Sequence, residues 1–173
     1  MDNEPTEELI TIVMLKTFDA AQEENEKGIF NCYTPANIYI KNFNITNLET
    51  MFIKFGAPII NKKNHKDGCY ISPDVHQGKP PSSKAVIFSL GLIWDEIFHH
   101  TPYYSSIADI KDPESIFFLI LVKYDVRNQN INPIIKNLLA DMLIRDPDER
   151  LGWAEARKRV SLQKYVTGAS SKK

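Results

Sequence analysis

The segment Ser83–Phe98 has the sequence SKAVIFSLGLIWDEIF, in which apolar residues occupy almost every position. A helix at a protein surface carries its apolar residues on one stripe, whereas a helix that is apolar all round lies inside a domain. The segment is shorter than the roughly 20 apolar residues that span a bilayer. We therefore expect a helix buried at the centre of the fold.

The sequence before this segment predicts one helix and one hairpin. Apolar spacing predicts a helix over residues 9–26, with Gly28 as its stop. Two β-type runs, Ile38–Ile40 and Met51–Ile53, flank a loop rich in Asn and predict a small hairpin. Residues 56–82 are rich in Gly, Pro, Asn and Lys without a period, which predicts a long loop.

The sequence after the central segment predicts three more helices. Proline just inside the first turn supports helices over 112–123 and 132–144, because the proline ring fits that position. Asp146-Pro147 breaks the chain, and a last helix begins over 153–160. Polar tails are expected over 1–8 and 167–173, so that one domain occupies 9–166.

Composition and charge narrow the class of protein. The 173 residues are 43% hydrophobic and 25% charged, as in ordinary soluble domains. A net charge of -1 gives no support to nucleic acid as a partner, since such binders carry a basic surplus. Two cysteines make no disulfide framework, and the acidic N-terminus has no secretory pattern. We expect an intracellular, cytoplasmic protein without membrane insertion.

Three motifs, in order along the chain, resemble the large lobe of a protein kinase. Gly68–Val75, GCYISPDV, resembles the end of the activation segment, where Ala-Pro-Glu is usual. Lys84–Gly91, KAVIFSLG, is similar to the K-A-D-x-W-S-L-G pattern that opens the buried central helix. LLADML at 138–143, followed by DPDER at 146–150, resembles L-L-x-x-M-L-x-x-D-P-x-x-R.

The resemblance extends upstream of these motifs. Gly28–Ile38, GIFNCYTPANI, resembles the catalytic loop G-I-x-H-R-D-L-K-P-E-N-I, and Lys54–Gly56 stands where Asp-Phe-Gly is usual. The similarity covers 9–166 and only the large, C-terminal lobe. It implies a mainly α fold, an α+β remnant in which a helical bundle surrounds a buried central helix beside a small β-hairpin, with no N-terminal lobe.

The catalytic positions implied by the resemblance have lost their usual residues. Cys32 stands at the catalytic aspartate, Thr34 at the lysine that follows it, and Lys54 at the metal-binding aspartate. Of the metal ligands only Asn37 remains, and one amide beside an ammonium cannot hold magnesium ions. Tyr39 fills the position beneath the adenine. We therefore expect no phosphoryl transfer, no nucleotide and no cofactor.

The packing positions are retained. The resemblance implies that Asp74 and Arg150 form a buried ion pair that ties the activation segment to the base of the lobe. Phe30 replaces the catalytic-loop histidine and Val86 the buried aspartate, which exchanges a polar tether for apolar contact. Phe30 and Phe55 are large apolar residues with rings suited to stacking.

Other polar residues have both a chemical and a structural interpretation. Cys32 is a reactive thiol or, in our preferred interpretation, a buried cysteine, because the sequence offers it no base. His65, Cys69 and His76 have spacings that match no standard zinc site. The basic stretch 61–66 forms a solvated loop or contacts an acidic partner, such as a tubulin-like or nucleic-acid surface.

Two function classes follow from the resemblance, with residual nucleotide binding as a third, less favoured possibility. The leading one is a non-catalytic, pseudokinase-like structural or scaffolding subunit of a larger protein assembly, because a bare large lobe exposes the apolar face that the small lobe normally covers. The alternative is a regulatory pseudokinase that binds an active kinase or its substrate beside 68–110. The high content of Asn, Ile and Lys fits a protist as the source. We expect the protein to belong to a ciliary, cytoskeletal or organellar complex. The apolar face comprises Phe30, Tyr39, Phe52 and Phe55; the interaction candidates are Tyr39, Phe52, Phe55, Lys62 and Lys63.

Overall fold

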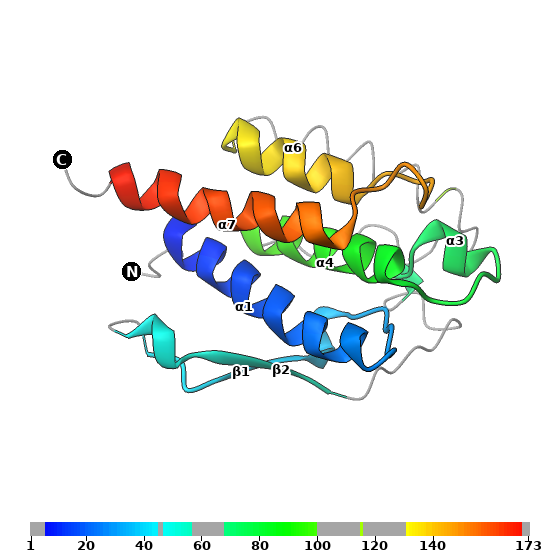
Figure 1. Ribbon diagram of the computed structural model, residues 1–173, viewed down its shortest axis with the longest axis horizontal. Helices are drawn as coiled ribbons and strands as arrows, with labels where there is room; N and C mark the ends of the chain where they lie inside the picture. Colours follow the sequence, from blue (N-terminus) through cyan, green and yellow to red (C-terminus); the bar gives the residue numbers. More distant parts are fainter. Residues whose placement is uncertain (1–5, 45–46, 57–67, 100–114, 116–130, 171–173) are drawn as a thin grey trace.

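The structure, a computed structural model, describes residues 6–44, 47–56, 68–99, 115 and 131–170 (Figure 1). Within them it is mainly helical, with one two-stranded antiparallel hairpin, as the sequence predicted. The longer helices are α1 (Glu7–Glu26), α4 (Ser83–His99), α6 (Pro133–Met142) and α7 (Trp153–Ser170); the strands are β1 (Ile38–Lys41) and β2 (Phe52–Phe55); the short helices are η1 (Pro35–Asn37), η2 (Leu48–Thr50) and α3 (Pro73–His76).

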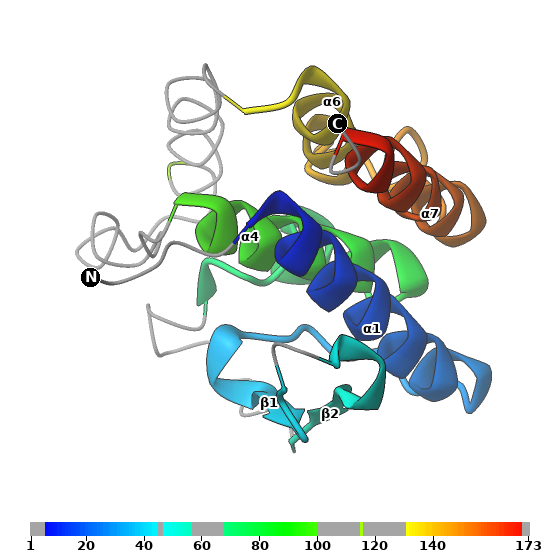
Figure 2. The ribbon, with the colours of Figure 1, turned by 90° about the vertical axis from the view of Figure 1, so that its left-hand side faces the viewer.

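Helix α4 is the centre of the fold. Every residue from Ala85 to Glu96 is buried, because α1, α6 and α7 all contact this helix. Figure 2 shows α4 in the middle of the molecule, with the hairpin on one side and α6 and α7 on the other. The all-round apolar sequence of Ser83–Phe98 therefore predicted both the helix and its burial, and both are confirmed.

Helix α1 lies between the hairpin and the helices. Its first turn is capped by the Thr6 side chain, which accepts a hydrogen bond from the main-chain N–H of Leu9 at 3.2 Å. Gly28, with a φ of 74°, follows its C-terminal end, since glycine adopts this left-handed conformation at no steric cost. One face of α1 packs on α7 and another on β2.

The register of the hairpin determines which side chains share each of its two faces. Tyr39 is paired with Lys54, and Lys41 with Phe52, so these four side chains share the face that points away from the helices. On the other face Ile53 is buried, consistent with the packing of β2 on α1. The predicted hairpin is confirmed. Strand β1 extends one residue beyond the expected Ile38–Ile40, and β2 covers Phe52–Phe55 where Met51–Ile53 was expected.

Three segments differ from expectation or lie beyond the description. Helix α3 lies inside the segment 56–82, which was expected to be a loop. The sequence did not predict this helix, because four residues are too few to show a helical period. Helix α7 continues to Ser170, although the polar sequence suggested a tail from residue 167. The helix expected over 112–123 lies outside the described residues. Asn132 caps α6 as expected, accepting a hydrogen bond from Ile134 N–H at 3.0 Å.

A membrane-spanning helix would need a long apolar stretch. Within the described ranges, no helix combines that length with that hydropathy.

The ring of Phe18 joins three helices, which makes it a sensitive test of the core. Phe18 is fully buried in α1, and its ring centroid lies 4.7 Å from that of Trp94 in α4 and 4.9 Å from that of Trp153 in α7. We expect Phe18→Ala to lower the free energy of unfolding by about 3–5 kcal/mol, measured by urea denaturation. The exposed Leu162→Ala should change it by about 0.5 kcal/mol or less. Equal effects of the two variants would contradict this core.

Candidate functional site

Cys32, for which the kinase resemblance implies the position of a catalytic aspartate, is buried. The residue is 2% exposed and belongs to a small apolar cluster with Ile71, Val75 and Ala85. Burial among apolar side chains is typical of a structural cysteine, whereas reactive cysteines lie in exposed, electropositive surroundings. The position thus joins the loop after α1 to the segment that leads into α3.

Asn37 and Thr34 are hydrogen-bonded to each other. The side-chain oxygen of Asn37 accepts hydrogen bonds from the main-chain N–H of Thr34 at 3.2 Å and from its hydroxyl at 2.9 Å. Both residues are buried, and the reciprocal bonds form a capping box around η1. The amide oxygen that a metal ion would need therefore stabilises a turn. The main-chain oxygen of Asn37 accepts a further bond from Gly56 N–H at 2.8 Å.

Tyr39 and Lys54 lie together on the outer face of the hairpin, away from the buried Cys32. The Lys54 ammonium is 5.7 Å from the centroid of the Phe52 ring, a cation–π arrangement at the surface. The Tyr39 ring covers the backbone of Gly56, where a Cβ atom would lie 2.8 Å from Tyr39 Cε2. The structure thus bonds Thr34 to Asn37 and pairs Tyr39 with Lys54 across the hairpin.

Glu24 of α1 organises this loop, and the sequence analysis missed it. Its carboxylate accepts hydrogen bonds from the Tyr33 hydroxyl and, at 3.2 Å, from the Asn31 amide. Burial raises the pKa of the Tyr33 hydroxyl far above its ordinary value, and the nearby Glu24 carboxylate raises it further. Tyr33 is therefore a neutral hydrogen-bond donor. No short-range signal in the sequence relates Tyr33 to Glu24 near the end of α1.

The two apolar rings singled out in the sequence, Phe30 and Phe55, pack in different ways. Phe55 stacks on Tyr33, with ring centroids 3.9 Å apart and planes 18° apart. Phe30 is half-buried and packs against the main core, to which Val86 belongs. The two apolar replacements thus contribute to one cluster. Of the expected apolar face, Tyr39 and Phe52 are exposed, whereas Phe30 and Phe55 are half-buried.

The guanidinium of Arg150 has four hydrogen-bond acceptors in the described structure. Arg150 is buried, with 1% of its surface exposed. Its guanidinium forms an ion pair with Asp74, with 3.0 Å between Nη2 and Oδ1. It also donates to the main-chain oxygens of Ile144 at 2.7 Å, Lys84 at 2.9 Å and Arg145 at 2.8 Å. One buried cation thereby joins α3, the start of α4 and the turn after α6.

Two further contacts complete this junction. The guanidinium carbon of Arg150 lies 5.1 Å from the centroid of the Phe88 ring in α4, and the Lys84 ammonium donates to the main-chain oxygen of Arg150. Burial lowers the pKa of Arg150, and the ion pair with Asp74 opposes that shift. The charge is tolerated inside the protein because its donors have acceptors.

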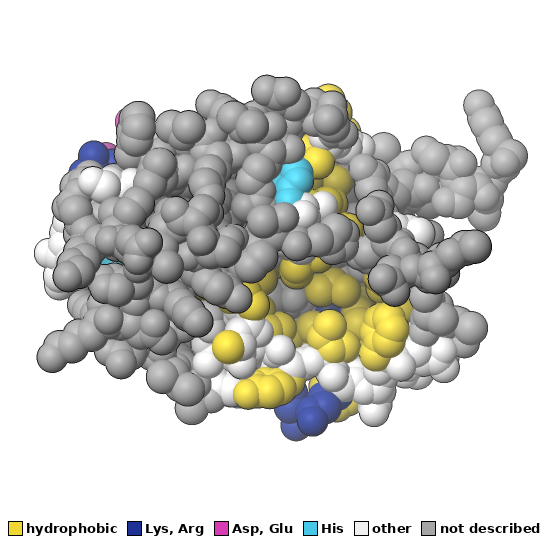
Figure 3. All heavy atoms as spheres, turned by 180° about the vertical axis from the view of Figure 1, so that it is seen from behind, with side chains coloured by type: hydrophobic (Ala, Val, Ile, Leu, Met, Phe, Trp, Pro, Cys, Tyr) yellow, Lys and Arg dark blue, Asp and Glu magenta, His cyan; other side chains and the backbone are white. Residues whose placement is uncertain are grey.

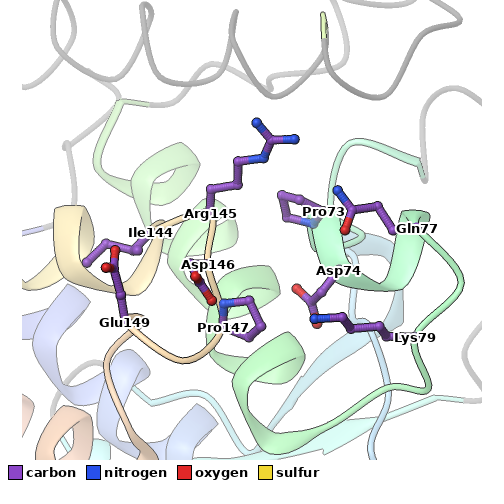
Figure 4. A pocket seen from close by; sticks show the side chains of 9 residues that line it. All are labelled: Pro73, Asp74, Gln77, Lys79, Ile144, Arg145, Asp146, Pro147 and Glu149. Atoms are coloured by element: carbon purple, nitrogen blue, oxygen red, sulfur yellow. The ribbon is translucent and has the colours of Figure 1, made fainter.

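A cleft of about 360 Å³ lies beside this junction (Figure 4). Pro73 of α3 and Gln77, which follows this helix, form one side, and Pro147 lies across from them in Figure 4. The cleft carries charges of both signs, and its volume is within the range of small-ligand sites. Its lining residues are Pro73, Asp74, Gln77, Lys79, Ile144, Arg145, Asp146, Pro147 and Glu149.

The remaining candidates do not form a site in the described part of the chain. His65, Lys62 and Lys63 lie outside the described residues. Cys69 is buried, and His76 Nε2 lies 2.8 Å from the main-chain oxygen of Gly68. Among the described side chains, no group of three or more His, Cys, Asp or Glu residues is placed to hold a metal ion.

The buried ion pair gives a direct test. Asp74→Ala leaves the Arg150 guanidinium buried without its counter-ion, so we expect the free energy of unfolding to fall by about 3–5 kcal/mol. The control is Asp19→Ala, which removes an exposed ion pair in which Asp19 Oδ1 lies 2.8 Å from Arg157 Nη2. This variant should lower the free energy of unfolding by about 1 kcal/mol or less. Chemical denaturation of both variants measures the difference. A loss for Asp74→Ala no larger than for the control would refute the role of the buried pair.

Comparisons with known proteins agree with a kinase-like relationship. No protein family model matches the chain. Over 102 residues, or 57% of the chain, its sequence is 31% identical to serine/threonine-protein kinase 36 of Pongo abelii. The matched segment is 7% of the length of that kinase. This weak similarity supports a relationship to protein kinases and no finer assignment.

Proposed function

We propose that the chain is a non-catalytic, pseudokinase-like protein that corresponds to the large lobe of a kinase and serves as a structural subunit of a larger protein assembly. The observation that carries the proposal is the outer face of the hairpin, where Tyr39 is 52% and Phe52 39% exposed. Large aromatic side chains gathered on one exposed face are typical of interaction sites. Figure 3 shows hydrophobic side chains gathered beside basic ones in the lower part of the molecule, where the hairpin lies.

The absence of catalysis in this proposal is supported by what the implied catalytic positions do. The oxygen of Asn37 is bonded to Thr34, and the thiol of Cys32 is buried in an apolar cluster. Lys54 places a cation at the position of a metal-binding carboxylate. These contacts are those of a folded scaffold, and none of them prepares a phosphoryl group for transfer.

A second candidate function is supported by the cleft beside Arg150. A regulatory pseudokinase would bind an active kinase or its substrate through the groove next to 68–110, and the cleft includes Pro73, Gln77 and Lys79 of that region. In this alternative the partner is a single signalling protein. Under either function we assign the domain to 9–166 and the protein to the cytoplasm, in a ciliary, cytoskeletal or organellar complex for the first.

Nucleotide binding can be tested with the purified protein. Any ligand present at 100 times its Kd stabilises a folded protein by about 2.7 kcal/mol. Because Tyr39 covers Gly56 and Asn37 is engaged by Thr34, we expect ATP with Mg²⁺ to leave the unfolding temperature unchanged. Mg²⁺ alone is the control in the same thermal-shift measurement. A rise that requires both ATP and Mg²⁺ would show that the nucleotide site has survived.

The assembly itself is tested by tagging the protein in its native cell and isolating it gently. We expect it to co-purify in a fixed ratio with a large set of structural proteins, which mass spectrometry would name. Native mass measurement of the same sample is the check. A free species of single-chain mass would overturn the proposal, and a one-to-one complex with an active kinase would favour the regulatory alternative.

A further inference from the structure

The outer face of the hairpin alternates aromatic and cationic side chains. We call the set Tyr39, Lys41, Phe52 and Lys54 the hairpin face. The register pairs Tyr39 with Lys54 and Lys41 with Phe52, so each strand contributes one aromatic residue and one lysine. The two aromatic residues therefore lie on one diagonal and the two lysines on the other, with diagonal neighbours about 7–8 Å apart.

The two lysines give this face a positive charge that the described structure does not neutralise. All four residues are exposed, and no ion pair with a described carboxylate engages Lys41 or Lys54. Among the described residues 38–44 and 47–56, the charged side chains are Lys41, Lys54 and Glu49, so the hairpin carries a small positive charge. The chain as a whole has a net charge of -1, so this positive charge is local.

We propose that the hairpin face binds an acidic, aromatic-containing segment of a partner protein. Carboxylates of the partner would neutralise Lys41 and Lys54, while its aromatic side chains would cover the rings of Tyr39 and Phe52. The inference rests on the proposed function as an assembly subunit, and it adds the chemistry of the partner. Phe43, which is 53% exposed just beyond β1, extends the apolar part of the contact.

Two other occupants fit these observations less well. A second copy of the chain would bring four lysines, two from each copy, into one contact in which the hairpin face offers no carboxylate to neutralise them. A single-stranded nucleic acid would stack on the rings, but two lysines on a chain of net charge -1 provide little of the basic surplus such binding uses. Acidic protein is the occupant that satisfies both the rings and the local charge.

Peptide binding to the full chain tests the proposal. The probe is a fluorescein-labelled peptide made of two copies of Glu-Glu-Phe-Glu-Glu-Tyr, and its control is the same peptide with Lys in place of Glu. We expect the acidic peptide alone to bind, with an affinity that falls as salt rises. Lys41→Gln with Lys54→Gln should weaken it about tenfold, since each exposed ion pair contributes a few-fold. Phe52→Ser should weaken it at every salt concentration.

The matched control is Lys27→Gln with Lys158→Gln, which removes two exposed lysines outside the hairpin and outside the cleft beside Arg150. It should change peptide affinity by less than twofold, and circular dichroism should show that all variants are folded. The proposal is overturned if the acidic peptide does not bind, if the control double variant weakens it equally, or if Lys41→Gln with Lys54→Gln has no effect. Tighter binding of a 20-nucleotide oligo-dT would overturn it in favour of nucleic acid.

A second experiment separates this proposal from the proposed function. Wild type and both double variants are tagged in the native cell and isolated in parallel. Loss of the partners from Lys41→Gln with Lys54→Gln, but not from the control, supports the hairpin face. If all three co-isolate with the same proteins in the same ratio, the assembly role stands and the hairpin inference fails. If wild type is isolated alone, the assembly role itself fails.

Discussion

The ion pair between Arg150 and Asp74 is the constraint on which the arrangement of the described segments depends. Arg150 is buried, so each of its donors requires an acceptor, and the acceptors come from α3, the start of α4 and the turn after α6. A charge inside a protein is costly unless these partners stay in place. The segments are therefore fixed relative to α4, which also forms the core with α1, α6 and α7.

The loop between α1 and β1 is held in place by contacts within the chain. Its polar side chains are engaged within the chain, as in the bonds of Asn37 to Thr34 and of Tyr33 to Glu24. Its apolar and aromatic side chains join the core or stack, as Tyr33 does on Phe55 of β2. The hairpin that follows is the described region where aromatic and cationic groups face solvent together, and this contrast directs attention to binding in place of catalysis.

The sequence predicted the fold where a local pattern was strong enough. The apolar run of Ser83–Phe98 specified both a helix and its burial, and Gly28 and Asn132 marked helix ends through their own chemistry. Helix α3 is too short to carry a period, so it was interpreted as loop. The bond of Glu24 to Tyr33 depends on the chain folding back, and neither residue type alone indicates it. The meeting of Asp74 and Arg150, 76 residues apart, was foreseen only through the kinase resemblance.

The acceptors of Arg150 have a consequence for how this sequence can change over generations. Three of them are main-chain oxygens, of Lys84, Ile144 and Arg145, and every amino acid supplies such an oxygen. Drift of the side chains at those positions therefore leaves the guanidinium bonded. At this junction, folding depends on the identities of Arg150 and of its single carboxylate partner, whereas the residue types at the three positions that supply main-chain oxygens can vary. The junction can thus persist while much of the surrounding sequence changes.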